Sequence, residues 1–292
     1  IHPVQVETVC WISASKIVLS TFFYLSALIC YIQYMRNSKW QYLLASVVSS
    51  ILAMGCKEQS VIIVPCLLLF DWMLFKRNMR SLKVYIEKVY YLIPAIAIFI
   101  VTLVANKNTG EEIIGYTIVD RFIFLCYSSF KYLLISAIPF KLSYLYPFPF
   151  QVGEKIPMAL WIYPFVILFI GYVIYLNRRK PLLVFCTLFF ILHLLPVLHV
   201  IPLPRYVVAA DRYLYIPYIA FAIGLSILSY HLYERQRKWI LYAGFLYCSY
   251  LCVYTAGYAP AWKNSDTLKE HFKEVLKKRE TNLSINFKHE KQ

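Results

Sequence analysis

The stretches IVLSTFFYLSALICYIQY at 17–34 and WQYLLASVVSSILAMGC at 40–56 are two apolar runs separated only by MRNSK at 35–39. Neither run contains an Asp, Glu, Lys or Arg. About 20 apolar residues in a helix cross a hydrocarbon core about 30 Å thick. The two runs therefore predict a pair of membrane-spanning helices joined by a short basic turn.

The composition extends this prediction to the whole chain. Hydrophobic residues make up 60% of the 292 residues and charged residues only 15%, and the mean hydropathy is +0.58. A soluble domain of this length and composition would aggregate. We predict an all-α, polytopic transmembrane helical bundle with spans at 17–34, 40–56, 61–75, 90–105, 159–176, 182–200, 215–230 and 239–258.

The net charge of +15 does not indicate a nucleic-acid partner, because the basic residues are spread over short connections and form no continuous basic arm. The positive-inside rule explains them better. It predicts four cytoplasmic loops, marked by Arg36 and Lys39, by Lys76, Arg77, Arg80, Lys83 and Lys88, by Arg178, Arg179 and Lys180, and by Arg235, Arg237 and Lys238. Residues 1–16, 57–60, 106–158, 201–214 and those after about 259 are then expected on the opposite face, the external face.

The segment RFIFLCYSSFKYLLISAIPF at 121–140 does not fit this alternation, because it is apolar enough to span yet must begin and end outside. Lys131 and the serines at 128, 129 and 136 form a polar stripe typical of a helix lying in the headgroup layer. We therefore predict an interfacial or re-entrant helix here. The alternative is a ninth full span with one basic loop assigned to the wrong side.

Rare charges mark three motifs on the expected external face. They are Glu7 in HPVQVE, Lys57 and Glu58 in CKEQ, and Asp211 and Arg212 in VAADRYLYIP. Ionisable groups at the edge of an apolar bundle lose hydration, so they pair with one another or with a charged substrate such as a phosphate. This face is the predicted site of chemistry.

The common signatures of soluble enzymes and metal sites are missing from the sequence. It has no Gly-rich phosphate loop, no GxSxG and no HExxH. The eight cysteines form no CxxC pairs at zinc spacing, so no metal ligands are assigned. No cofactor is indicated either.

The chain changes character after residue 258. A polar, lysine-rich tail at 259–292 is expected to leave the membrane, so we divide the chain into a transmembrane domain at 1–258 and this tail. Ser265 or Asp266 is expected to cap a helix that runs to about residue 279. Its apolar stripe has no evident partner within the chain and comprises Leu268, Phe272, Val275 and Leu276.

Four stretches carry a resemblance to a known family: HPVQVETVCWISASKIVLSTFFYLSALICYI at 2–32, CKEQSVIIVPCLLLFDWMLF at 56–75, LPVLHVIPLPRYVVAADRYLYIPYIAFAIG at 195–224 and AWKNSDTLKEHF at 261–272. In order and spacing they resemble the TPR-containing membrane O-mannosyltransferases and their bacterial relatives, a group of GT-C glycosyltransferases. The resemblance covers nearly the whole chain.

The resemblance implies a fold of GT-C type and transfer of a sugar, mannose or similar, from a polyprenyl or dolichyl phosphate carrier to an acceptor hydroxyl on a protein or glycan. The carrier is a co-substrate, and some GT-C enzymes also use a divalent metal ion. The active site is expected on the periplasmic or luminal side of a bacterial inner membrane, or of the ER membrane in a eukaryote. GT-C enzymes generally place a catalytic acid in a first external loop, and TPR repeats usually follow. The chain is therefore expected to be a fragment without that loop and without most of the repeats.

The motif residues receive roles from the chemistry of such a transfer. A general base must take a proton from the acceptor, and cations must hold the departing lipid phosphate. Arg212 and Arg205 are the best candidate phosphate ligands, because a guanidinium matches phosphate oxygens with paired donors, and Lys57 is a third cation. The predicted catalytic carboxylates are Glu7, Glu58 and Asp211. The remaining predicted substrate-binding residues are His2 and Tyr213. Among these, Asp211 or Glu58 is expected to orient the cations, and Glu7 with His2 to hold acceptor or sugar hydroxyls.

Structural roles compete with each assignment. Asp211 next to Arg212 is also typical of an ion pair at the end of a span, Lys57–Glu58 of a helical hairpin, and His2 of a turn cap. His193 and His199 suit contacts between helices, and Asp71 suits an anchor at a helix end. For the whole chain, the alternatives are a transporter or flippase, and a polymerase or ligase of lipid-linked glycans.

Overall fold

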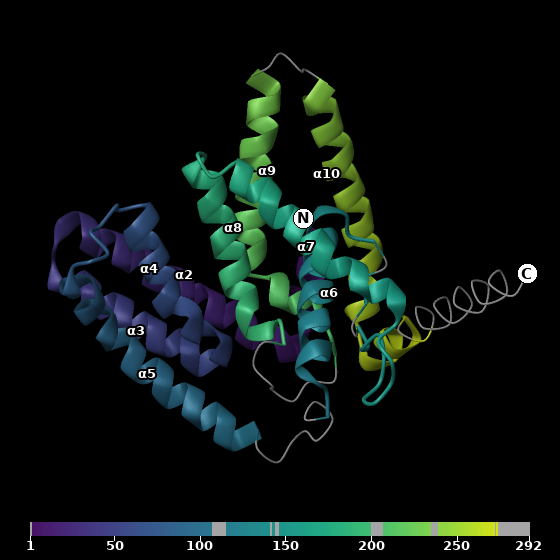
Figure 1. Cartoon of the computed structure of the whole chain (residues 1–292), viewed down its shortest axis with the longest axis horizontal. Coiled ribbons are helices and arrows are strands. Elements are labelled where there is room, and N and C mark those ends of the chain that lie inside the picture. Colours follow the sequence, from purple (N-terminus) through teal and green to yellow (C-terminus); the bar gives the residue numbers. More distant parts are fainter. Residues whose placement is uncertain are drawn as a thin grey trace, which may run out of the picture.

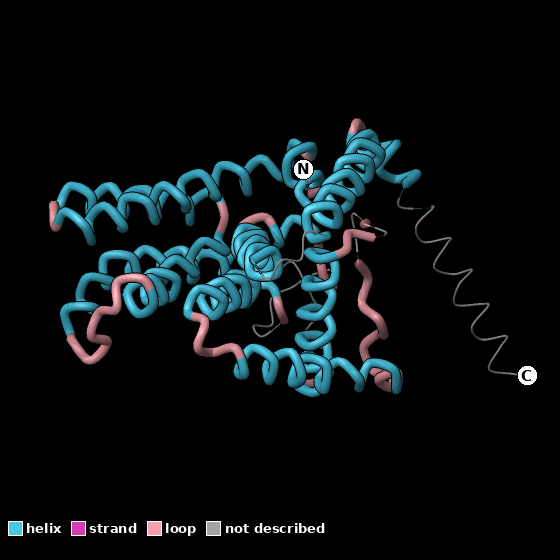
Figure 2. Tube along the Cα trace, turned by 90° about the horizontal axis from the view of Figure 1, so that it is seen from above, coloured by secondary structure: helices cyan, strands magenta, loops and turns pink. Residues whose placement is uncertain are grey.

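The computed structural model describes residues 2–106, 115–140, 142–143, 146–199, 207–234, 239–271 and 273. In these ranges the chain is all-α and polytopic, with no strand and one isolated bridge between Tyr146 and Ala209. Helices make up most of the described trace, and short loops connect them (Figure 2). The predicted fold class is confirmed.

Each of the eight predicted spans contains an α-helix, although the helices within 61–75 and 182–200 are several residues shorter than the predicted spans. The α-helices are α1 (Val6–Cys10), α2 (Ser15–Asn37), α3 (Trp40–Cys56), α4 (Ile63–Met73), α5 (Leu82–Asn106), α6 (Ile118–Ala137), α7 (Ile162–Leu176), α8 (Pro181–Leu194), α9 (Pro217–Glu234) and α10 (Trp239–Tyr258). Short 3₁₀ turns flank them: η1 (Pro3–Gln5), η2 (Ile12–Ala14), η3 (Glu58–Ile62), η4 (Met158–Trp161), η5 (Leu195–Val197), η6 (Asp211–Leu214) and η7 (Ala259–Trp262). Four helical segments of the described chain are long and apolar enough to cross a membrane: Ile12–Asn37, Leu82–Ala105, Met158–Leu176 and Trp239–Trp262.

The α2–α3 hairpin forms as the opening stretch predicts. Ser38 adopts a left-handed backbone conformation at φ 54°, and its N–H donates to the Tyr34 carbonyl at 2.8 Å, which ends α2 and reverses the chain. Small hydroxyl residues hold the two helices together: Ser46 Oγ donates to the Ala27 carbonyl at 2.7 Å, and Ser20 Oγ to the Ala53 carbonyl at 2.9 Å. Such close contacts between helices are typical of packing in membranes, where lipid is as apolar as leucine.

The third predicted span, 61–75, is shorter as a helix than expected. α4 has 11 residues and therefore extends about 16 Å, too little to cross a hydrocarbon core alone. It contacts both α5 and α8. Its ends are turns that carry charged residues, η3 before it and Arg77 after it.

The segment predicted as interfacial or re-entrant is one unbroken helix, α6, of 20 residues. A capping box starts it: Thr117 Oγ1 accepts the N–H of Asp120 at 3.2 Å, and the Asp120 carboxylate accepts the N–H of Thr117 at 2.7 Å. The predicted polar stripe faces protein, because Ser128 and Ser136 are buried, and so is Tyr132 between them. Ser129 and Lys131, the other two residues of the stripe, are half-buried, so the stripe packs at least in part on protein, while the predicted interfacial or re-entrant placement of the helix stays a prediction.

Two hydrophobic clusters form the core. One lies among α2, α3, α4 and α5, which gather on one side of Figure 1, and the other lies among α6, the 142–150 segment, η6 and α10. Helix α8 joins them, since Cys186 and Phe189 belong to the first cluster and Phe190 and Leu194 to the second. It also packs along α9.

The tail begins with a helix, and its cap differs from the predicted one. Asn264 caps this helix in place of Ser265 or Asp266, because Asn264 Oδ1 accepts the N–H groups of Asp266 at 3.1 Å and Thr267 at 2.8 Å. Leu268 packs on the second cluster, so this part of the stripe does have a partner in the chain. Phe272, Val275 and Leu276 lie outside the described side chains.

Candidate functional site

The site is built around an ion pair between the first and the last of the three motifs. Arg212 Nη1 donates to Glu7 Oε1 at 2.6 Å, and the backbone N–H of Arg212 donates to Glu7 Oε2 at 2.9 Å. Glu7 lies on the short helix α1 and is fully buried. Both carboxylate oxygens of Glu7 therefore contact Arg212, while its predicted role in holding hydroxyls stays a prediction.

Two aromatic rings complete the surroundings of the Arg212 guanidinium. Its central carbon lies 5.1 Å from the centroid of the Tyr213 ring and 5.6 Å from that of Trp11. Rings at these distances favour a cation. Glu7 and the rings together fix the orientation of the guanidinium, while about 20% of its side chain stays exposed.

Asp211 faces away from its neighbour Arg212. The Tyr146 hydroxyl donates to Asp211 Oδ1 at 2.8 Å, and Asp211 is buried. Lys131 of α6 lies nearby, with its Nζ 4.0 Å from the centroid of the Tyr146 ring. The structure therefore contains two carboxylates with separate partners in place of the expected Asp211–Arg212 ion pair.

The electrostatic environments of the two carboxylates differ. Burial raises the pKa of Glu7, and the Arg212 charge opposes this shift. Burial and the neighbouring Glu7 charge raise the pKa of Asp211 well above its ordinary value. Asp211 is thus the carboxyl group of this site that most favours its protonated form.

The middle motif supplies a second ion pair. Lys57 Nζ donates to Glu58 Oε1 at 2.6 Å, at the junction between α3 and η3. The Lys57 side chain is 16% exposed and that of Glu58 is 43% exposed. Burial opposes the ionised form of Glu58, but the charge and hydrogen bond of Lys57, a backbone hydrogen bond and the Lys16 charge together lower the pKa of this carboxylate.

Lys57 and Arg212 line the same small cavity, of about 40 Å³. Its wall comes from α2, η3, α8 and η6, and includes Ser20, Thr21, Ser60, His193 and Tyr213. The volume suits about one water molecule. Two cations from distant parts of the chain therefore face one polar cavity, each held by its own carboxylate.

The remaining predicted ligands are placed as follows. His2 caps the first turn, because its Nδ1 accepts the N–H of Val4 at 3.3 Å, and burial lowers its pKa to about 4. Its ring packs against that of Tyr218, with 4.4 Å between the centroids and an angle of 36° between the ring planes. Arg205 lies outside the described residues. Of the two histidines assigned to helix contacts, His193 bonds to the Tyr24 hydroxyl at 2.8 Å and His199 to the Val208 carbonyl at 3.0 Å.

Three residues of the site carried no signal in the sequence. Tyr146 and Trp11 belong to none of the assigned motif residues, and Lys131 was assigned to a stripe that faces the headgroups. Each reaches the site through tertiary packing alone. Their roles could not be inferred from local patterns.

The described residues were also tested against a divalent ion. No group of three or more His, Cys, Asp or Glu side chains within them is arranged to hold a metal. Glu7 uses both of its oxygens on Arg212, Asp211 accepts from Tyr146 through Oδ1, and no third acid, histidine or cysteine of the described chain joins them. This donor set does not fit a metal ion.

A second charged cluster lies near the ends of the spans that the loop charges predict to be cytoplasmic. Asp71 accepts from Tyr31 at 2.6 Å and pairs with Lys88 at 2.6 Å, and Arg77 pairs with Glu87 at 2.6 Å. Arg77 also reaches Asp71 at 3.4 Å. These contacts join α2, α4 and α5, which agrees with an anchoring role for Asp71.

Comparisons of the chain with family models, with curated proteins and with solved structures give no match.

Proposed function

We propose that this protein is an integral-membrane glycosyltransferase that moves a sugar, mannose or similar, from a polyprenyl or dolichyl phosphate carrier to an acceptor hydroxyl on a protein or glycan. The GT-C assignment and the external location of the site are parts of this proposal. The observation that carries it is the pair of cations, Lys57 and Arg212, that line one cavity at one end of an apolar bundle. Because this cavity suits only about one water molecule, the proposal places the carrier phosphate at its mouth, where 16% of the Lys57 side chain and 20% of the Arg212 side chain are exposed.

The reaction explains why two cations are useful. The bond between the sugar C1 and the carrier phosphate oxygen breaks, and a bond between C1 and the acceptor oxygen forms. The released phosphate gains one negative charge, and the acceptor hydroxyl loses its proton to a base. Oriented cations stabilise charge that develops in the transition state, more effectively where water is scarce.

The three predicted acids take different parts in this scheme. Glu58 is the most exposed of the three acids and therefore the one an acceptor can reach, so we assign to it the removal of the proton from the acceptor hydroxyl. Glu7 orients Arg212. Asp211, buried and bonded to Tyr146, fixes the backbone beside Arg212.

Lys57 offers a clearer test than Arg212. Removing Arg212 leaves the buried Glu7 carboxylate without its cation, a change that typically costs about 3–5 kcal/mol and harms folding whatever the function. Removing Lys57 leaves only a half-exposed Glu58 without its partner. Lys57→Gln should therefore test the combined contribution of Lys57 to phosphate binding and to the environment of Glu58, with little effect on the fold.

The experiment measures transfer from labelled polyprenyl-phosphate mannose in reconstituted membranes with the complete gene product. Lys57→Gln is expected to lower the transfer rate by at least about tenfold. The control is Lys155→Gln, an exposed lysine of the 151–157 loop that removes the same charge. Equal rates in both variants would contradict the assignment of Lys57, and a folded wild-type protein that transfers no lipid-linked sugar would contradict the proposed function.

A further inference from the structure

Exposed cations gather where the α2–α3 turn meets the α4–α5 loop. Met35, in the last turns of α2, contacts Arg77 of this loop, with 3.8 Å between Sδ and Nη1. The Tyr34 hydroxyl donates to the Glu87 carboxylate of α5 at 3.3 Å. The turn and the loop therefore share one end of the bundle, on the left of Figure 1. The basic surface at this end consists of five exposed side chains, Arg36, Lys39, Lys76, Arg80 and Lys83.

The acids of this end point inward, so the charge of the basic surface is not compensated. Residues 34–40 and 71–88 contain seven cations and only two acids, Asp71 and Glu87. Both acids are buried, and they pair with the two cations outside the basic surface, Arg77 and Lys88. Within the described residues, no acidic side chain pairs with the other five cations. The bundle therefore presents five positive charges on the outside of an internally neutral network.

The α4–α5 loop that carries part of this surface is held in one conformation. The N–H of Arg80 donates to Asn78 Oδ1 at 3.0 Å, and the Tyr85 hydroxyl donates to the Met79 carbonyl at 3.0 Å. Lys76 adopts a left-handed backbone conformation at φ 49°, which favours glycine or asparagine. A lysine here keeps a charge on the surface in spite of backbone strain, and strain of this kind concentrates at functional positions. A ligand therefore meets cations that need little further ordering.

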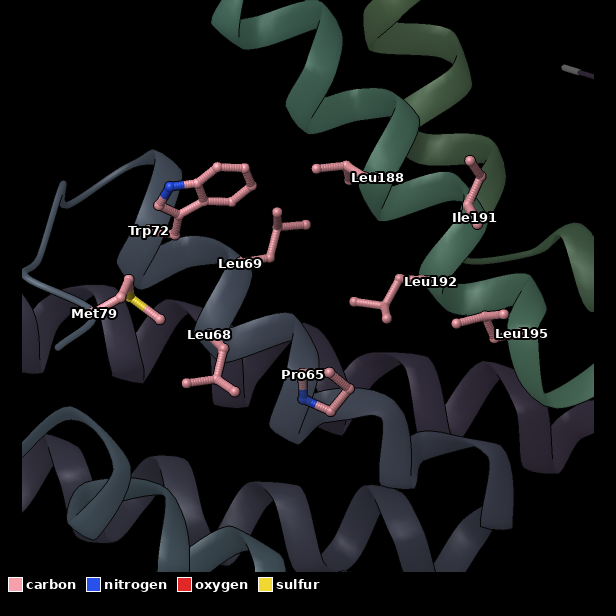
Figure 3. A pocket seen from close by; sticks show the side chains of 9 residues that line it. All are labelled: Pro65, Leu68, Leu69, Trp72, Met79, Leu188, Ile191, Leu192 and Leu195. Atoms are coloured by element: carbon pink, nitrogen blue, oxygen red, sulfur yellow. The ribbon is translucent and has the colours of Figure 1, made fainter. Parts of the chain in front are cut away.

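Apolar side chains beside the loop place the basic surface at the level of lipid headgroups. Met79 of the loop and Trp72 of α4 line the same end of an apolar groove between α4 and α8 (Figure 3). The rings of Trp72, Trp40 and Tyr85 are exposed. Exposed tryptophan and tyrosine rings are typical of the boundary between hydrocarbon and headgroups. The cations next to these rings in the chain are therefore within reach of lipid phosphates.

We propose that the basic surface binds the headgroups of anionic phospholipids, whose phosphodiester charge no ammonium group of the lipid neutralises. Lysine and arginine donate charge-assisted hydrogen bonds to phosphate oxygens, and a cluster of them is attracted to an anionic leaflet. A zwitterionic lipid brings its own cation and gains less from this surface. The loop charges predict that the leaflet is the cytoplasmic one. The inference depends on the membrane location of the chain and not on the proposed sugar transfer.

The test is a titration of the full-length, delipidated protein in a neutral detergent with dioleoylphosphatidylglycerol and, separately, with dioleoylphosphatidylcholine, followed by native mass spectrometry of the bound lipids. The wild type is expected to bind the anionic lipid at least about tenfold more tightly than the zwitterionic lipid. A higher salt concentration is expected to weaken binding of the anionic lipid, because exposed charges are screened. Equal affinities for the two lipids, or an affinity for the anionic lipid that does not change with salt, would overturn the proposal.

A triple variant tests whether the basic surface is the binding site. Lys39→Gln, Lys76→Gln and Lys83→Gln together remove three exposed charges, so the fold should be retained. The affinity for phosphatidylglycerol is expected to fall about tenfold or more, while the affinity for phosphatidylcholine stays unchanged. The corresponding changes Lys39→Arg, Lys76→Arg and Lys83→Arg keep the charges and should keep the affinity.

The matched control is Lys155→Gln combined with Lys263→Gln and Lys269→Gln. It removes the same number of charges from exposed positions on the face that is predicted to be external. This control is expected to bind phosphatidylglycerol as tightly as the wild type does. Wild-type affinity in the glutamine variant of the basic surface, or an equal loss of affinity in the control, would overturn the proposal.

Discussion

Two carboxylates of the site, Glu7 and Asp211, bind different partners. Glu7 binds both the side chain and the backbone of Arg212, whereas Asp211 turns to Tyr146. The sequence identified both acids as members of the site. It could not predict this partition, because the partners are 205 and 65 residues apart along the chain.

The raised pKa of Asp211 predicts a pH dependence of stability. The folded protein holds a proton on this group that the unfolded chain, with an ordinary value of 3.8, has released. Its contribution to stability is therefore complete below about pH 4 and declines as the pH rises toward the folded pKa. Asp211→Asn keeps an oxygen that accepts from Tyr146 and removes this titration.

Thermal unfolding in detergent between pH 5 and 9 checks the prediction. The midpoint of Asp211→Asn is expected to rise relative to that of the wild type as the pH increases. A constant difference between the two proteins across this range would show that Asp211 titrates as an ordinary exposed carboxyl.

The buried pair of Glu7 and Arg212 makes a second prediction at this scale. Arg212→Ala is expected to lower stability by about 3–5 kcal/mol, because it leaves Glu7 buried and unpaired. Adding Glu7→Gln removes the uncompensated charge and should restore part of the loss. A thermal-unfolding comparison of both single variants and the double variant measures the coupling, and additive losses would mean that the pair is not energetically linked.

Among the elements, α4 depends most on its end contacts, because it is too short to span alone. Asp71 at its end meets Tyr31 of α2 and Lys88 of α5, and Arg77 extends the contacts to Glu87. Asp71 is fully buried. The sequence indicated an anchor at this residue but could not identify its partners.

This network predicts strong coupling between Asp71 and Lys88. Asp71→Asn and Lys88→Met are each expected to destabilise the protein by about 2–5 kcal/mol, since each leaves a buried charge with one partner fewer. The double variant should lose less than the sum, by about 0.5–3 kcal/mol. The thermal midpoints of the wild type, the two single variants and the double variant measure this coupling. Strictly additive losses of stability would show that Asp71 and Lys88 are not coupled.

For helix α6, the sequence pattern predicts the helix and its polar stripe but not what the stripe faces. Apolar composition predicted a helix, and the serine and lysine positions predicted a polar stripe. Polar stripes, however, suit a lipid headgroup layer and a polar protein interior equally well. Only the packed structure places Ser128, Tyr132 and Ser136 inside the bundle.

For the whole molecule, apolar runs and loop charges predicted the helices and the shared face of the motif residues better than any single motif did. The positive-inside pattern assigned Glu7, Lys57 and Arg212 to one face, and the folded chain brings these three residues to one end of α2. The Asp71 network lies toward the other end, at Tyr31. The pattern could not supply the pairings within each end, because these depend on how distant helices pack.

The assignment of sides can be measured directly in right-side-out membrane vesicles. With the native cysteines replaced, Glu154→Cys is expected to react with an impermeant thiol reagent in intact vesicles. Asn78→Cys should react only after permeabilisation, because its loop is predicted to be cytoplasmic. Reaction of both positions from one side would contradict the alternation of the spans.

The most direct measurement for the central claim is sugar transfer from polyprenyl-phosphate mannose in reconstituted membranes, compared among the wild type, Lys57→Gln and Lys155→Gln. The account predicts transfer by the wild type and by Lys155→Gln, and a loss of about tenfold or more in Lys57→Gln at unchanged thermal stability. Absence of transfer from every lipid-linked sugar donor tested, by a folded wild-type protein, would contradict it and make flux of a lipid-linked or anionic solute the next quantity to measure.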